Sequence, residues 1–398
     1  MPAKEQTGKP GRVSKAGFRS RIGQFTWDNF TCTQSTGAVA VMLSKTPYQF
    51  HGLQTVGVVI FILNLALIAL FSSAMVARFV THPRALKPSL TRPPECFFVA
   101  SFLLTGATVI MCTQCFGVPR AGPWLVAAVR ALFWLYAAAS LAFVVAVYAM
   151  LFTPRRTVRL AAAPPPVFLT VYNAMLTGTV AATVAGTQPP GHRLAIVAAG
   201  VAYQGLGWVL SLLLLSWYLA GMLERGPGTR NQRPALFLTV GSSGYTIVCL
   251  IGCARDLPSG YGYFERHPMG VEILQVVADW VGVFLWLLTF WLFAVALVIN
   301  VAAAIPIMEG RRFIRAGMAF TVPWWSFVFP NVGFTIATGF IGEQFQSNAI
   351  KWVATIMTVL VFAFWFMDLV LYFKAILTGQ IMVPVKPEEN NRNHDIGA

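Results

Sequence analysis

Charged residues are scarce in this chain. Asp, Glu, Lys and Arg make up 11% of its 398 residues, whereas apolar residues make up 57%. A soluble domain usually carries about 25% charged residues, and here long apolar runs recur from one end of the sequence to the other. The composition therefore excludes a sizeable soluble domain and indicates a chain that is embedded in a membrane almost throughout.

Motifs for nucleotide binding and for catalysis are also missing. The sequence contains no P-loop, no G-x-S-x-G and no H-E-x-x-H. Without a nucleotide-binding domain, any transport must be driven by gradients. We therefore expect neither an enzyme with catalytic residues nor a protein with a cofactor.

Cysteine is sparse, and its pattern fits no disulfide framework or metal site. The six cysteines lie within or at the ends of apolar segments, so we interpret them as small apolar residues. Cys112 and Cys115 form a single C-x-x-C without a second pair or a nearby histidine. A zinc or redox site needs more than this pair, and we expect no bound metal.

A signal peptide is absent as well. The first 24 residues hold six Lys or Arg and no apolar core, so we expect the first membrane segment to act as the signal anchor. The predicted organisation is a basic cytoplasmic tail over 1–24, a ten-helix transmembrane domain over 25–377 and a cytoplasmic C-terminal tail over 378–398.

The apolar runs predict an all-α integral membrane fold with ten transmembrane helices. Each run reaches or exceeds the ~20 residues that a spanning helix needs. The predicted spans are 25–44, 52–77, 95–117, 124–153, 165–187, 194–223, 234–254, 271–304, 316–342 and 349–377.

The basic residues predict the orientation of these spans. Of the 29 Lys and Arg, 22 lie on one side of the membrane, in or next to the two tails and the loops that follow even-numbered spans. The other seven lie on the opposite side. The positive-inside rule therefore puts both termini in the cytoplasm. The net charge of +15 is then mostly a signal of topology, and we expect no nucleic-acid partner. The sequon Asn29-Phe-Thr31 would lie on the cytoplasmic side and stay unused.

Every odd-numbered span carries a small, polar cluster near its middle, and every even-numbered span is filled with large apolar side chains. Either tight helix packing or a lined cavity explains one such cluster. Five clusters at similar depth favour five helical hairpins, with an inner ring of odd-numbered helices around a central pore and five outer helices. The clusters are Thr33–Gly37, Leu104–Thr108, Leu176–Thr179, Thr239–Gly244 and Asn331–Thr335.

A polar or charged solute that crosses a bilayer through such a pore must recover its lost hydration. Hydroxyls, backbone N–H groups and helix N-termini supply that. The predicted substrate path is Thr36, Gly37, Thr105, Thr177, Ser242, Ser243, Asn331 and Thr335.

Charged residues near the spans leave two questions open. Arg255 and Arg120 end the seventh and third spans, where they either draw anions to the pore mouth or act as ordinary interfacial arginines. Asp279 and Asp368 lie within outer spans. Either one would serve a proton-coupled carrier, or else it pairs with a neighbouring helix or protomer.

Several ordered stretches resemble one family of membrane proteins. These are Phe25-Thr-Trp27, Thr31–Gly37, Gly52-Leu-Gln-Thr-Val-Gly57, Gln204-Gly-Leu-Gly207, Arg233-Pro-Ala-Leu-Phe237 with Val240-Gly241, and Phe327-Val-Phe-Pro-Asn-Val-Gly-Phe334. They are similar to stretches of the tellurite-resistance/dicarboxylate transporter family, over about residues 20 to 385. That family contains fungal malic acid transport proteins, plant slow-type anion channels and fungal sulfite efflux pumps.

The resemblance implies ten helices in five hairpins, a central pore in each protomer, a homotrimer and a pore-blocking phenylalanine on the ninth helix. Plant anion channels carry Trp-Trp-x-x-x-Phe-Pro there, and its phenylalanine matches Phe329. We predict a gate made of Phe329, Pro330 and Gly333, because proline and glycine loosen a helix.

The same resemblance favours the malic acid transport branch. It implies gradient-driven transport of C4-dicarboxylates such as malate and succinate across the plasma membrane, with or without coupled protons. The alternative is a sulfite or monovalent-anion exporter or channel. One departure keeps the choice open, because Gly241-Ser-Ser stands where malic acid transporters usually have Gly-Pro-Pro. The expected partners are the anion, membrane lipid and two further copies of the chain.

Overall fold

The computed structural model describes residues 18–153, 165–305, 307–309, 312–315 and 318–381. Most of both predicted tails lies outside these residues. Within them, eight helical segments are long and apolar enough to cross a membrane, which confirms the prediction of a helical, multi-pass membrane protein. The segments are Leu53–Thr81, Glu95–Arg120, Pro123–Leu151, Pro165–Thr187, Pro190–Arg225, Arg230–Arg255, Gly270–Ala304 and Asn348–Leu377.

These segments coincide with eight of the ten predicted spans to within a few residues. The first and ninth predicted spans correspond to α2 (Phe30–Lys45) and α11 (Phe329–Gln344), which have only 16 residues each. Each is preceded by a 3₁₀ turn, η1 (Trp27–Asn29) before α2 and η11 (Val322–Phe327) before α11. The regular α-helix is thus shorter than the apolar run that predicted it.

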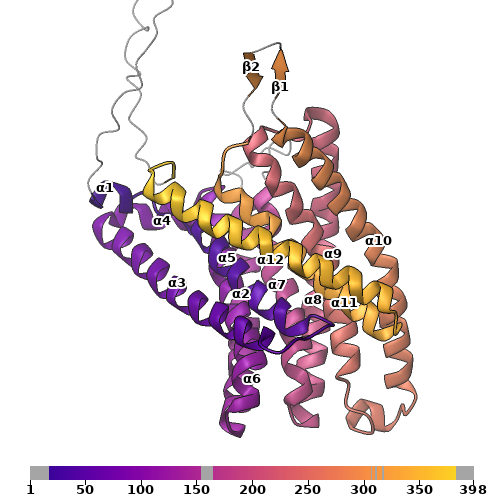
Figure 1. Ribbon diagram of the computed structural model, residues 1–398. Helices are drawn as coiled ribbons and strands as arrows, with labels where there is room; N and C mark the ends of the chain where they lie inside the picture. Colours follow the sequence, from indigo (N-terminus) through magenta and orange to yellow (C-terminus); the bar gives the residue numbers. More distant parts are fainter. Residues whose placement is uncertain (1–17, 154–164, 306, 310–311, 316–317, 382–398) are drawn as a thin grey trace, which may run out of the picture.

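The prediction of an all-α fold missed one small element. The strands β1 (Ile307–Glu309) and β2 (Arg312–Arg315) pair antiparallel, with Ile307 opposite Arg315. They lie at one end of the molecule, beyond the helices (Figure 1). Strands of three and four residues are too short for an alternating pattern to show in the sequence.

Five helices form a closed inner ring. In order, α2 contacts α5 (Val99–Cys112), α5 contacts α7 (Leu169–Val184), α7 contacts α9 (Leu238–Arg255), α9 contacts α11, and α11 returns to α2. Each of them packs against the long helix that follows it in the chain. Those partners are α3 (Leu53–Thr81), α6 (Pro123–Leu151), α8 (Pro190–Arg225), α10 (Gly270–Ala304) and α12 (Asn348–Leu377).

Burial separates the two sets of helices clearly. In the segments that contain α7 and α9, 94% of the most apolar stretch is buried, whereas the five long helices bury only 17% to 33% of theirs. Every residue from Phe30 to Leu43 in α2 and from Phe329 to Gly342 in α11 is buried. The long helices thus present apolar side chains to the surroundings, as lipid-facing helices do.

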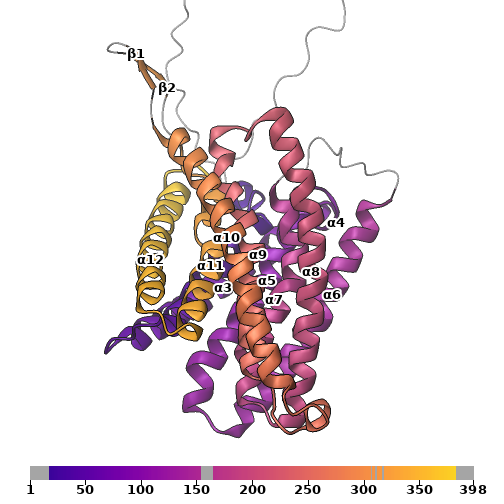
Figure 2. The ribbon, with the colours of Figure 1, turned by 90° about the vertical axis from the view of Figure 1, so that its right-hand side faces the viewer.

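All five inner helices begin at the same end of the molecule. The first described residue, Phe18 in α1 (Phe18–Ile22), and the C-terminal end of α12 also lie at this end (Figures 1 and 2). We call it the tail side and the opposite end the far side. A short helix, α4 (Leu86–Thr91), also lies on the tail side, between α3 and α5.

A 3₁₀ turn precedes each inner helix. In addition to η1 and η11, these are η3 (Glu95–Phe98), η7 (Pro165–Phe168) and η9 (Arg230–Phe237). Four of the five contain or directly follow a proline. Proline has no N–H and a fixed φ, so it suits the first turn of a helix but not its interior.

Candidate functional site

Two joined cavities open from the tail side toward the centre of the ring. The wider one, which we call the vestibule, has a volume of about 590 Å³. The narrower one has a volume of about 20 Å³, which is room for about one water. The two share five lining residues, Phe98, Pro166, Ala235, Val322 and Pro323. Together they form a funnel whose narrow end lies inside the ring.

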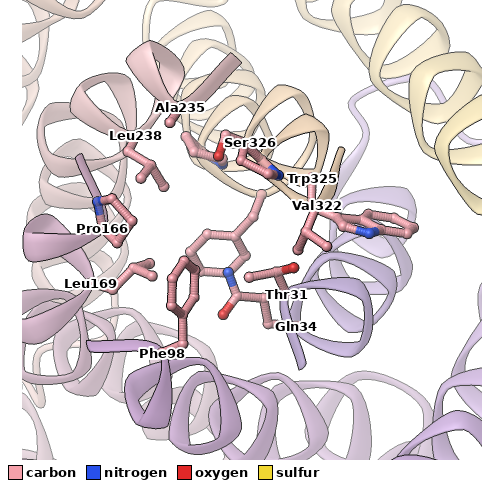
Figure 3. Close-up of a pocket in the computed structure, with 13 residues that line it drawn as sticks. Thr31, Gln34, Phe98, Pro166, Leu169, Ala235, Leu238, Val322, Trp325 and Ser326 are labelled. Carbon is pink, nitrogen blue, oxygen red and sulfur yellow. The ribbon is translucent and has the colours of Figure 1, made fainter. Parts of the chain in front are cut away.

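The narrow cavity is lined at the starts of the five inner helices, by first-turn residues of four of them and by the 3₁₀ turn before α5. Thr31 comes from α2, Phe98 from η3, Leu169 from α7, Leu238 from α9 and Phe329 from α11. Figure 3 shows side chains from these separate elements converging on one space. The cavity therefore lies on the axis of the ring.

The narrow end of the funnel favours anions over cations, because the N-termini of five helices surround it. A helix N-terminus carries unpaired N–H groups and a partial positive charge of roughly half an elementary charge. Such ends favour anions, and broken helices in transporters use them in this way. The charged residues of the vestibule lining are Asp28 and Arg225, and none lines the narrow cavity. Backbone dipoles thus dominate the narrow end.

Polar side chains in the narrow cavity come from α2 and η11. Gln34 and Thr31 point from α2 into it, and Ser326 reaches it from η11 (Figure 3). Thr31 donates its hydroxyl to the carbonyl of Asp28 at 2.6 Å. Gln34 is 2% exposed, and its Oε1 makes no hydrogen bond. A buried amide oxygen without a hydrogen bond destabilises the protein, so Gln34 favours binding of a polar ligand in this cavity.

Phe329 and Pro330 lie at the inner end of the funnel. Phe329 is 1% exposed, and its ring lies 5.3 Å from the ring of Tyr245 on α9. The Tyr245 hydroxyl donates to the Phe329 carbonyl at 2.8 Å. The side chain that the sequence predicts as a gate thus stands against a second aromatic ring.

Two glycines allow α9 and α11 to approach each other closely beside that second ring. A β-carbon at Gly333 would lie 2.9 Å from the Tyr245 ring, so α11 passes directly over it. A β-carbon at Gly244 would lie 2.8 Å from the backbone nitrogen of Phe334. The polar clusters of α9 and α11 therefore bring two backbones together, in addition to any part in the path.

Four residues of the predicted path lie at interfaces between helices. The hydroxyl of Thr36 accepts a hydrogen bond from Trp365 of α12 at 3.1 Å, and a β-carbon at Gly37 would collide with Thr108 of α5. Thr105 contacts Thr33 of α2 at 2.8 Å between hydroxyls, and Thr177 contacts Ser140 of α6 at 3.0 Å. None of the four lines either cavity.

The other four path residues lie on α9 and α11, beyond the funnel. Ser242 and Thr335 donate their hydroxyls within their own helices, to Thr239 at 3.0 Å and to Asn331 at 2.8 Å. Asn331 donates to the Phe327 carbonyl at 2.9 Å, but its Oδ1 is buried without a partner. The hydroxyl of Ser243 is also buried without a partner. These two atoms are therefore available to contact a polar ligand.

The two arginines predicted at the pore mouth differ in their surroundings. Arg255 ends α9 on the far side, where its guanidinium lies 4.9 Å from the centre of the Phe340 ring and 3.8 Å from Glu343. Arg120 is exposed and donates to the Phe116 carbonyl at 2.9 Å. Arg255 thus lies over an inner helix, whereas Arg120 closes the end of its own segment.

An acidic residue follows Arg255 directly. Burial raises the pKa of Asp256, and the nearby Arg255, Lys45 and Arg193 partly oppose that shift. Three cations therefore lie near the two carboxylates of Asp256 and Glu343 at the far side of the ring, which leaves a small positive excess. Such a region attracts anions over a distance of about one Debye length.

Sequence reasoning missed two residues that the structure brings to the site. Tyr245 directly follows the cluster Thr239–Gly244 on α9. In the sequence it could not be distinguished from the other aromatic and apolar residues of the span. Gln34 lies inside the cluster on α2, three residues after Thr31 and so on the same face of the helix. That spacing was the available signal for Gln34.

Comparison with known proteins points to one family. Residues 24–373 match the voltage-dependent anion channel family, SLAC1. The chain is 30% identical over 369 residues to the malic acid transport protein of Schizosaccharomyces pombe, across 93% of this chain and 82% of that protein. A putative malic acid transport protein of the same organism is 26% identical, across 93% and 84%. The sulfite efflux pump SSU1 of Trichophyton rubrum is 26% identical, across 89% and 93%.

Proposed function

The chain belongs to the voltage-dependent anion channel family, and from this premise we propose that it carries C4-dicarboxylates such as malate and succinate through a pore gated by Phe329. Membership confirms the resemblance seen in the motifs. The relatives are named as transport proteins, which agrees with the expectation of a transporter and not an enzyme. Transport of anions is thus the shared property, and the dicarboxylate is our proposal.

We infer that α2 and α11 also cross the membrane, which makes ten spans in five hairpins. Each has 16 residues in regular helix, but its 3₁₀ turn lengthens the crossing segment. Both helices are buried on all sides and close the ring. Because lipid does not touch them, their polar clusters carry no cost against hydrocarbon.

The single observation that carries the proposal is the funnel. It opens on the tail side, narrows from about 590 Å³ to about 20 Å³ and ends against Phe329. Five helix N-termini surround the narrow end, and its lining holds no Lys or Arg. The anion is then attracted by dipoles but not trapped by a fixed cation, and conduction needs such weak binding.

The gate in this proposal is a pair of rings. Phe329 closes the path, and the Tyr245 hydroxyl holds the backbone of Phe329 in place. The sequence predicts Pro330 in the interior of a helix, but the structure places it in the first turn of α11, where its missing N–H costs no helical hydrogen bond. Phe329 thus lies at the junction between η11 and α11, and at this junction the chain has the freedom to turn the ring out of the path when the bond to Tyr245 breaks.

We assign the tail side to the cytoplasm because most Lys and Arg lie in the tails and in the loops on that side. The plasma membrane as location and the homotrimer rest on the family resemblance. A trimer would place lipid around the exposed apolar faces of the long helices and one path in each protomer.

Sulfite is the second candidate substrate, because sulfite efflux pumps match the chain over 89% of its length. The experiment that separates the two is flux into liposomes that contain the purified protein. We expect labelled malate to enter faster than labelled sulfite at equal concentration. Strong sulfite flux without malate flux would overturn the proposal in favour of the sulfite pump.

A further inference from the structure

One face of α12 packs against one face of η1 and α2 in three antiparallel pairs. Tyr372 donates its hydroxyl to Asn29 Oδ1 at 2.6 Å. Seven residues earlier on α12, Trp365 donates to Thr36 at 3.1 Å. Asp368 lies between Trp365 and Tyr372 on the same face of α12. Cys32 occupies the matching position on α2, between Asn29 and Thr36, and it is close enough to interact electrostatically with Asp368.

The middle pair differs from the outer two, because no hydrogen bond joins the Asp368 carboxyl to any residue that the structure describes. Its side chain is 0% exposed, and neither carboxyl oxygen makes a hydrogen bond. The ion pairs of the described residues, Arg78–Glu95 and Arg255–Glu343, do not involve it. An isolated ionised carboxylate in an apolar interior is strongly disfavoured, so such a group binds a proton instead.

The described elements that pack against α12 offer the carboxyl no counter-ion. The one charged residue of α11, Glu343, is acidic and lies 3.8 Å from Arg255 on the far side. From α2 the titratable neighbour is Cys32, and from α12 itself it is Tyr372. Phe71 of α3 and Trp325 of η11 contribute only rings, which lie against Tyr372. On η1, Asp28 has a second carboxylate near it, Glu95, which is paired with Arg78.

A row of polar groups leads from Asp368 to the vestibule. Tyr372 lies one helical turn from Asp368 toward the tail side, and its hydroxyl bonds to Asn29. Asn29 in turn donates from Nδ2 to Asp28 Oδ1 at 3.1 Å. Asp28 lines the vestibule. Two hydrogen bonds thus join the Tyr372 hydroxyl, one helical turn from Asp368, to a carboxylate at the vestibule.

The carboxyl lies behind the wall of the funnel, because α12 packs against α2. Cys32 and Thr36 on α2 face α12, whereas Thr31 and Gln34 on the same helix point into the narrow cavity. A change of charge on Asp368 therefore acts on the helix that carries the polar groups of the path. No other described acidic residue is buried behind this wall without a partner.

We propose that Asp368 is the proton-binding site that couples proton movement to anion transport. A proton from vestibule water adds to the carboxylate to form the neutral acid, and it returns to water when the site opens again. The inference rests on the proposed function and extends it from a gated pore to a proton-coupled carrier. The structure also separates Asp368 from Asp279, which lies half-exposed on α10.

The test compares Asp368→Asn with Asp279→Asn in liposomes that contain the purified full chain. With the interior one pH unit more alkaline, the membrane potential held at zero by potassium and valinomycin, and one proton per malate dianion, the unaltered protein accumulates malate about tenfold. We expect Asp368→Asn to lose this accumulation while malate exchange without a gradient persists. Asp279→Asn should accumulate malate like the unaltered protein. Full accumulation by Asp368→Asn would overturn the inference.

A second measurement does not depend on transport. In detergent at pH 7, the infrared difference spectrum between the unaltered protein and Asp368→Asn should show the C=O band of a protonated carboxylic acid. Absence of that band would overturn the inference. If the unaltered protein neither accumulates nor exchanges malate, the proposed function fails, and this band still decides whether Asp368 binds a proton.

A third variant serves if Asp368→Asn does not fold. Tyr372→Phe should slow proton uptake but not malate exchange. An unchanged rate of proton uptake would contradict a part for Tyr372 in proton access to Asp368.

Discussion

The hydroxyl of Tyr245 on α9 donates to the carbonyl oxygen of Phe329 at 2.8 Å, and the two rings stand 5.3 Å apart. This contact joins two inner helices at the point where the funnel ends. Because Phe329 begins α11 directly after the 3₁₀ turn η11, the bond holds the backbone at the junction of the two elements.

Replacing Phe329 with alanine should open the path. The closed state would lose buried packing of about 3 kcal/mol or more, and every 1.4 kcal/mol corresponds to about tenfold in an equilibrium. We expect anion flux into liposomes to rise about tenfold or more. Phe327→Ala is the matched control, because Phe327 stacks on Phe364 of α12 and lines neither cavity. Equal flux in the two variants would contradict the gate.

Tyr245→Phe removes one hydroxyl and keeps the ring. A net hydrogen bond contributes about 0.5–1.5 kcal/mol, so the open population should rise about two- to tenfold. The measurement is the same flux, and the increase should be smaller than that of Phe329→Ala. If Tyr245→Phe lowers the flux, the hydroxyl serves the open path and not the closed one.

Gln34→Leu should reduce anion flux without unfolding the protein. The leucine fills a similar volume but removes the unpaired Oε1 and the amide N–H groups from the narrow cavity. Gln34→Glu should reduce the flux further, since a negative charge at that position repels the anion. Gln54→Leu, at an exposed position near the start of α3, serves as the control. Flux that is insensitive to Gln34 would place the path elsewhere.

Gly244→Ala should destabilise the protein, because the new β-carbon would lie 2.8 Å from the backbone nitrogen of Phe334. Overpacking of this kind typically costs about 1–3 kcal/mol, and thermal unfolding in detergent would show it as a lower midpoint. Gly106→Ala is the matched control on α5, where a β-carbon meets nothing within 4 Å. An unchanged midpoint for Gly244→Ala would mean that α9 and α11 move apart easily.

Asp256 gives a prediction about pH. Burial raises its pKa in the folded protein above the usual 3.8, so the folded state binds this proton more tightly than the unfolded state does. Its ionised form therefore destabilises the fold at neutral pH, and that effect disappears as pH falls toward 3.8. We expect Asp256→Asn to unfold at a higher temperature than the unaltered protein at pH 7 and at the same temperature near pH 4. A constant difference at both values would rule out ionisation as the cause.

Much of the architecture was accessible from the sequence. The ends of α6, α10 and α12 agree with the predicted spans to within a few residues, because the length of an apolar run decides where a membrane helix ends. The 3₁₀ turns were only partly indicated by their prolines. The β1–β2 pair was missed because its strands are too short to show a period.

The candidate site was accessible only in part. Phe329 and Pro330 do line the cavity, as the resemblance suggested. Thr36 and Thr177 have hydroxyls of the right kind at the right depth, but they bond to Trp365 and Ser140 on neighbouring helices. Sequence position gives the depth of a residue in the membrane but not the direction in which its side chain points.

The sequence by itself determined that this protein is a multi-pass membrane protein, roughly where its long helices begin and end, and to which family it belongs. These properties follow from the lengths of apolar runs and from ordered motifs, and both are local. Only the tertiary structure decided that Gln34 faces the cavity, that Tyr245 holds Phe329 and that Asp368 is buried without a partner. The rotation of a helix about its axis depends on the neighbours that pack against it, and those neighbours come from distant parts of the chain.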